Sequence, residues 1–129
     1  MIAVDTNVLV RYVTNDDPVQ AARAFELLKH ARDVFVPKTV VLETEWVLRA
    51  VYGLPRENVR NALLHVLGLP NVVVEDAERV AEAIDLYDGG MDLADALHLS
   101  SSSDADEFFT FDRRFERLAR GLGRPVRLL

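Results

Sequence analysis

The chain has 129 residues, about half of them hydrophobic, which is typical of one compact domain with a single core. Acidic residues outnumber basic ones by 21 to 15, which argues against a protein that holds nucleic acid by general electrostatic attraction. Clustered carboxylates that bind divalent cations can still attract a phosphate group. The absence of cysteine excludes thiolate metal sites and leaves carboxylates and three histidines, His30, His65 and His98, as possible ligands.

The sequence shows no membrane span and no targeting segment. No apolar run approaches the roughly 18 to 20 residues that cross a bilayer. Met1 is followed at once by Ile2-Ala3-Val4-Asp5, without a basic patch ahead of an apolar segment. We therefore expect a single domain over residues 1–129, located in the cytoplasm and not in a membrane.

The first half of the chain alternates short strands with helices. Ile2-Ala3-Val4 predicts a buried strand, and Asp5-Thr6-Asn7 is typical of a helix start. Pro18 suits the first turn of the next helix, where its missing N–H costs nothing. Residues 34–36 predict a second strand, and the period of apolar residues predicts a helix over 38–52 that ends at Gly53.

The second half repeats the alternation. Pro55 opens a further helix, and a glycine pair at 89–90 marks a break. The remaining expected elements are strands at 71–74 and 108–111, helices at 76–87, 92–102 and 113–120, and an edge strand at 125–128. Strands that alternate with helices in this way imply parallel pairing through right-handed crossovers. The predicted class is α/β.

Two aspartates follow predicted strands, where the sites of parallel sheets lie. Asp5 comes after the first strand and Asp112 after the fourth. Each could simply cap the helix that follows, because an aspartate side chain accepts a free backbone N–H there. Their shared position, after separate strands, favours a joint role in an acidic site.

A third acid, Glu43, interrupts a largely apolar stripe on the predicted helix 38–52 and has no basic residue one turn away. A carboxylate on a buried face needs a compensating charge or hydrogen bonds. Glu45 differs because Arg49 follows it by one turn, which predicts an ordinary exposed ion pair. We therefore take Glu43 as a candidate site residue and Glu45 as a surface residue.

Asp92 and Asp95 lie one turn apart at the start of a predicted helix. A cap at Asp92 and an acid favoured by the helix dipole at Asp95 would explain both. Asp95, however, is surrounded by apolar residues without a basic partner, which favours a site role. The capping account suits Asp92 better, and His98 is more typical of a packing residue than of a ligand.

The last predicted helix carries Arg113, Arg117 and Arg120 along one face. Such stripes are usually solvated surface. Because this one begins beside Asp112, it could also guide a phosphate backbone.

Four segments stand in a characteristic order: Ile-Ala-Val-Asp-Thr-Asn-Val-Leu at 2–9, Val-Leu-Glu-Thr-Glu-Trp-Val-Leu at 41–48, Asp-Leu-Ala-Asp-Ala-Leu-His at 92–98 and Phe-Phe-Thr-Phe-Asp-Arg-Arg-Phe at 108–115. With these segments the chain resembles the PIN-domain family and, within it, the VapC toxins of toxin–antitoxin modules. The resemblance extends over essentially the whole chain. It implies a three-layer α/β/α sandwich with a short central parallel sheet.

The resemblance also implies a function: an endoribonuclease that depends on Mg²⁺ or Mn²⁺, forms a homodimer and is inhibited by a cognate antitoxin protein. The family's acidic positions fall on Asp5, Glu43, Asp95 and Asp112, with Asp92 as a frequent additional neighbour at the metal. Thr6 and Thr110 fall where the family often has a small polar residue. Mg²⁺ held by such carboxylates can activate a water for attack on a phosphodiester.

Other functions remain open at this point. A PIN nuclease outside toxin modules would show the same acids. A non-catalytic regulatory module could bind metal in an acidic strand-end pocket, but a receiver domain would carry paired acids after its first strand and a late strand-end lysine, and neither is present. A haloacid-dehalogenase-like phosphatase needs a second aspartate two residues after the first, where this chain has Asn7.

Overall fold

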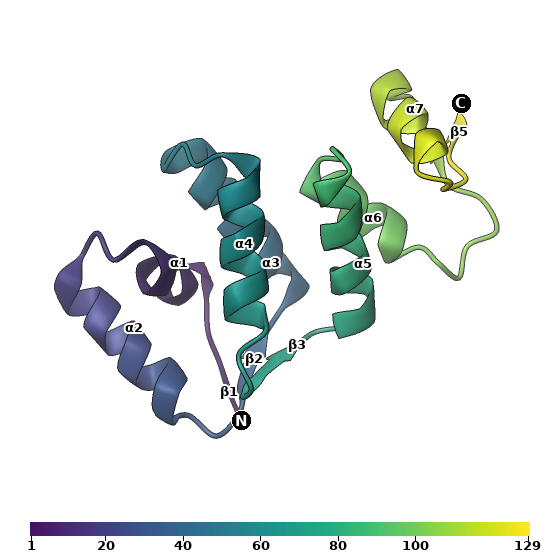
Figure 1. Cartoon of the computed structure of the whole chain (residues 1–129). Helices are drawn as coiled ribbons and strands as arrows, with labels where there is room; N and C mark the ends of the chain where they lie inside the picture. Colours follow the sequence, from purple (N-terminus) through teal and green to yellow (C-terminus); the bar gives the residue numbers. More distant parts are fainter. The chain divides into compact units, whose positions relative to one another are not determined.

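The computed structural model describes residues 1–129 and contains seven α-helices, one π-helical turn and five short strands (Figure 1). The elements are β1 (Ile2–Ala3), α1 (Thr6–Thr14), α2 (Pro18–His30), β2 (Val34–Val36), α3 (Lys38–Trp46), η1 (Val47–Val51), α4 (Arg56–Leu67), β3 (Val72–Val74), α5 (Ala77–Asp88), α6 (Leu93–Ser100), β4 (Phe109–Thr110), α7 (Arg113–Gly121) and β5 (Arg127–Leu128). The predicted α/β class is confirmed.

By its internal contacts the chain divides into two compact units, Met1–Ala77 and Glu78–Leu129. The expectation of a single domain over residues 1–129 stays a prediction. No helix has the length and apolar character needed to cross a membrane.

The first unit holds a three-stranded parallel sheet in the order β1-β2-β3. Ile2 aligns with Val34, and Val34 aligns with Val72. Parallel neighbours require long crossovers, which α1 and α2 provide between β1 and β2, and α3 to α4 provide between β2 and β3. The prediction that the first strand is buried is wrong for both residues of β1, with Ile2 39% exposed, because β1 is the edge strand of this sheet; only Val4, which follows it, is buried.

Local sequence signals set the helix boundaries of the first unit. Asp17 caps α2 by accepting a hydrogen bond from the Gln20 backbone N–H at 3.1 Å, and Pro18 occupies the first helical position, as predicted. Gly53, with φ of +66°, stands just beyond the last turn of the long segment that starts at Lys38.

The predicted helix over 38–52 is only partly correct. The α-helix ends at Trp46, and residues Val47–Val51 form a π-helical turn. The Tyr52 backbone N–H consequently donates to the Val47 carbonyl, five residues back, at 3.1 Å. Apolar periodicity alone does not distinguish the two helix types here, because five residues make only about one turn of either.

The core of the first unit forms where the helices pack on the sheet. Its fully buried apolar side chains come from the sheet and from both crossovers and include Leu9, Val34, Val36, Val41, Leu48, Val59 and Leu63. Each such side chain contributes about 1.5 to 3 kcal/mol relative to an exposed position. This burial holds the carboxyl ends of β1 and β2, and the residues that follow them, in place.

In the second unit, β4 and β5 form a parallel pair in which Phe109 aligns with Arg127. The edge strand expected at 125–128 is present only at Arg127–Leu128. Phe108 and Phe115 meet edge to face with ring centroids 5.6 Å apart, which fixes α7 against β4. A Cβ on Gly89 would lie 3.0 Å from the Leu122 side chain, so the glycine break lets the ends of α5 and α7 approach closely.

Candidate functional site

Three of the candidate acids occupy the N-cap of a helix and accept one backbone hydrogen bond. The pairs are Asp5 Oδ1 with the Val8 N–H at 3.3 Å, Asp92 Oδ2 with the Asp95 N–H at 3.4 Å, and Asp112 Oδ1 with the Phe115 N–H at 3.0 Å. The capping interpretation is thus correct for all three. All three residues are exposed, and the second carboxylate oxygen of each accepts no hydrogen bond. A cap therefore orients each side chain and leaves one oxygen available to a ligand.

Asp95 has the most perturbed carboxyl among the candidates. It is partly buried on the first turn of α6 and has no hydrogen-bonded or ion-paired partner for its side chain. Its pKa is raised above the ordinary value, first by burial and then by the negative charges of Asp92 and Asp112, with a smaller opposing effect from His98. The structure thus brings three predicted site residues of the second unit into one electrostatic neighbourhood.

Glu43 does not lie on a buried face, which corrects the sequence interpretation. Its side chain is exposed on α3 and makes no hydrogen bond or ion pair. The inward face of α3 and η1 is instead formed by Val41, Thr44, Glu45 and Leu48. Glu43 lies to one side of that stripe, and the absence of a basic partner is the part of the prediction that holds.

Glu45 was expected to be a surface residue, and this is wrong. It is 1% exposed, and its Oε2 accepts a hydrogen bond from Arg49 Nε at 2.8 Å. The predicted partner is correct, but the environment is not. The spacing of Val41, Thr44 and Leu48 carries the signal that was missed, because position 45 completes an i, i+3, i+4, i+7 stripe.

Two threonines stand beside the candidate acids. Thr6 is 5% exposed, and its hydroxyl oxygen has no hydrogen-bond partner within the chain. A buried hydroxyl without a partner is costly, and here it directly follows Asp5. Thr110 Oγ1 accepts a hydrogen bond from the Asp112 backbone N–H at 3.0 Å and so supports the turn that carries that aspartate.

The donor chemistry suits a hard divalent cation. Every candidate ligand is a carboxylate or hydroxyl oxygen, the type that Mg²⁺ and Mn²⁺ prefer. No group of three or more acidic or histidine side chains lies close enough together to hold a metal ion. Mg²⁺ usually keeps several waters and uses one or two direct carboxylates, so an open set fits it. The convergence of Asp5 and Glu43 with the acids of the second unit stays a prediction.

The arginine face of α7 is exposed, as expected. Arg120 pairs with Glu116 at 3.1 Å, whereas Arg113 and Arg117 make no ion pair. Arg117 also lines a shallow pocket at the end of α7, together with Leu122 and neighbouring residues. A solvated face explains these side chains, and contact with a phosphate backbone stays a prediction.

Comparison with known families decides the assignment. The PIN domain model matches residues 2–121, which include all five candidate acids. The chain belongs to the PIN-domain family. PIN domains are generally nucleases that use divalent metal ions, and the site role of the acids described above stays a prediction. No curated protein matched the chain at a significant level.

Proposed function

We propose that this PIN domain is an endoribonuclease that depends on Mg²⁺ or Mn²⁺ and cuts RNA phosphodiesters with an activated water. The observation that carries the proposal is the carboxyl of Asp95, which is partly buried near Asp92 and Asp112 and has no hydrogen-bonded or ion-paired partner. Clustered carboxylates with a raised pKa favour proton uptake or metal binding, and they are typical of functional sites.

Each residue has a role in this proposal. Asp5, Glu43, Asp95 and Asp112 hold the metal directly or through water, and Asp92 either joins them or only caps α6. When bound, a divalent ion supplies a nucleophilic water and stabilises charge on the phosphoryl oxygens. The caps of α1 and α7 orient Asp5 and Asp112, and the free hydroxyl of Thr6 offers one more hydrogen bond to a group beside Asp5.

We further propose that the nuclease is the toxin of a toxin–antitoxin pair and a homodimer. The resemblance to VapC toxins is the main support. A pocket of about 430 Å³ on the first unit adds to it, because its lining combines Tyr12, Phe25 and Leu28 with the Lys29 side chain. Apolar residues of an antitoxin tail suit such a groove between helices, and a basic residue of the tail suits the acidic site. A PIN nuclease outside toxin modules is the alternative.

Cleavage of labelled RNA by the purified protein, with Mg²⁺, Mn²⁺ or EDTA, tests the catalytic proposal. We expect cleavage only with metal. Asp5→Asn, Glu43→Gln and Asp95→Asn should lose more than the roughly 10- to 100-fold typical of removing an outer-shell partner of a metal. Glu26→Gln is the matched control, because Glu26 is an exposed helical acid paired only with His30. Activity that persists in EDTA would contradict the proposal.

The toxin proposal has its own test. Light scattering at micromolar concentration should give the mass of a dimer, and a small open reading frame beside the gene should encode a protein that inhibits cleavage. A monomer without such a neighbour would contradict the toxin role and leave the nuclease proposal intact.

A further inference from the structure

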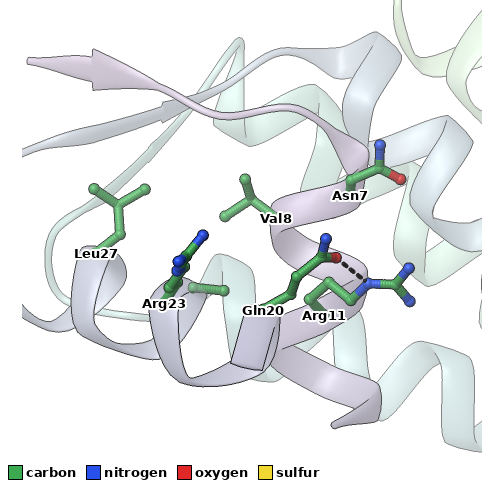
Figure 2. Close-up of a pocket in the computed structure, with 7 residues that line it drawn as sticks. Asn7, Val8, Arg11, Gln20, Arg23 and Leu27 are labelled. Carbon is green, nitrogen blue, oxygen red and sulfur yellow. Dashed lines mark hydrogen bonds between the residues drawn. The ribbon is translucent and has the colours of Figure 1, made fainter. Parts of the chain in front are cut away.

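A second pocket lies on the first unit, between α1 and α2. Its volume is about 290 Å³, and it is lined by Asn7, Val8 and Arg11 of α1 and Gln20, Arg23 and Leu27 of α2. Figure 2 shows the Val8 side chain of α1 directed toward Arg23 and Leu27 of α2, and the Gln20 side chain turned toward Arg11. The pocket therefore combines two arginines and two amides with an apolar wall.

Arg11 is held rigidly and already neutralised. Its Nε donates to Gln20 Oε1 at 2.7 Å (Figure 2), and its Nη1 donates to Asp16 Oδ1 and to the Tyr52 hydroxyl, both at 3.0 Å. The Gln20 side-chain oxygen accepts the bond from Arg11. The Gln20 amide nitrogen makes no hydrogen bond and remains available as a donor. Arg11 thus orients a neutral donor and is not the main attraction for an anion.

Arg23 is the free cation of the pocket. Its side chain is exposed and makes no hydrogen bond, ion pair or ring contact. Val8 and Leu27 give the pocket an apolar wall on which a planar group can rest. Its free polar groups are mostly donors, which suits an anion beside a flat ring.

Asn7 connects this pocket to the candidate acids. It lies on the first turn of α1, two residues after Asp5, and its side-chain amide has no partner. We propose that the pocket binds one nucleotide of the RNA substrate next to the bond that is cut. Arg23 contacts its phosphate, and the amides of Asn7 and Gln20 contact its base. This inference rests on the proposed ribonuclease function.

The chemistry of the pocket favours a nucleotide over a peptide partner. Its volume is near the lower limit of about 300 Å³ for small-ligand sites. Proteins read single-stranded RNA with amide side chains on base edges and with arginine on phosphates or ring faces. The pocket presents these side-chain types together, directly after a candidate catalytic aspartate.

Binding and cleavage of a fluorescein-labelled single-stranded RNA by wild type, Arg23→Ala and Arg32→Ala test the inference. Arg32 is a suitable control because it removes the same charge from a side chain that is 94% exposed and outside the pocket. Arg23→Ala should raise the Kd from anisotropy and the KM about tenfold, which equals roughly 1.4 kcal/mol, with little change in kcat. It should also lower the slope of log K against log salt by about 0.7.

The outcomes separate this inference from the proposed function. Weaker RNA binding by Arg23→Ala alone supports the pocket, even if no cleavage is found. Cleavage by wild type with equal KM values for Arg23→Ala and Arg32→Ala overturns the pocket and leaves the ribonuclease proposal standing. If wild type neither binds nor cuts RNA, both are overturned. If Arg23→Ala binds RNA as wild type does but is no longer inhibited by a protein partner, the pocket belongs to that partner and the inference is overturned.

Discussion

The buried carboxylate of Glu45 is neutralised within its own helical segment, by the guanidinium of Arg49 one turn later at 2.8 Å. Two residues earlier, Glu43 has no such partner and is exposed. One segment therefore carries two glutamates with opposite environments. Glu45 depends on its ion pair for stability, and Glu43 is available to a ligand.

The same substitution at these two positions should separate stability from activity. Glu45→Gln should lower the free energy of unfolding by about 1 to 3 kcal/mol, because Arg49 loses its counter-ion in a partly buried site. Glu43→Gln should change it by less than about 0.5 kcal/mol and yet remove metal-dependent cleavage. Urea unfolding at pH 7 and the RNA assay give the two readouts. Equal losses of stability would show that Glu43 is structural.

Asp95→Asn should stabilise the metal-free protein at neutral pH. The folded-state pKa of Asp95 is raised, so the folded protein binds its proton more tightly than the unfolded chain does. Stability therefore falls as the pH rises from the unfolded pKa through the folded pKa, and above that range the ionised group carries the full cost. The asparagine variant avoids this cost. Unfolding in EDTA should show a gain at pH 7 that disappears below the ordinary aspartate pKa.

The same variant should respond weakly to metal. Wild type should gain about 2.7 kcal/mol when Mg²⁺ or Mn²⁺ is at a hundredfold excess over its Kd. Asp95→Asn should lose most of this gain. Thermal unfolding across a Mn²⁺ titration measures both proteins. A variant that is less stable in EDTA and still shows the full metal shift would remove Asp95 from the site.

Two substitutions of Asp112 should divide its capping role from its proposed site role. Asparagine caps helices as well as aspartate does, so Asp112→Asn should keep the hydrogen bond from the Phe115 N–H and nearly all stability. Asp112→Ala should cost about 1 kcal/mol. Both should abolish cleavage if the carboxylate holds metal. Cleavage that survives in the asparagine variant would leave Asp112 with the capping role alone.

Tyr52→Phe should raise the pKa of Asp16. The Tyr52 hydroxyl donates to Asp16 Oδ2 at 2.7 Å, and this bond is the largest cause of the lowered pKa of Asp16. A depressed pKa stabilises the fold above the unfolded pKa, and the stabilisation is lost as the pH falls through the folded pKa. Carboxyl NMR titration should show a higher Asp16 pKa in the variant. Tyr12→Phe, which removes only a hydroxyl bonded to His65, should leave it unchanged.

Much of the fold could be predicted because its signals are local. Pro18 starts a helix wherever its neighbours allow one, and the apolar run at 34–36 is a buried strand by composition alone. The exposure of Ile2 depends on strand order, which no local pattern encodes. The π-turn after Trp46 likewise depends on packing over several elements.

For the site, the acids could be found by type and position, but their environments could not. Capping by Asp5 and Asp112 follows from their place after strands. Glu45 is buried and Glu43 is exposed, the reverse of the prediction, because the face that points inward depends on the exact rotation of the helix. An apolar stripe that includes a charged residue does not define that rotation. The raised pKa of Asp95 arises partly from Asp112, 17 positions later in the chain, and long-range proximity of this kind has no local signature.

The π-turn at Val47–Val51 gives this stretch a tolerance to the loss of one residue that a regular α-helix lacks. Each ring of a π-turn holds one residue more than an α-helical ring, so removing one residue here can restore α-helical winding without changing the phase of the residues that follow. Tyr52 comes directly after the turn and reaches Asp16 from there. A single-codon deletion within the turn should therefore leave the tyrosine directed at its partner, whereas the same deletion in the middle of α4 would rotate the rest of that helix by about 100°.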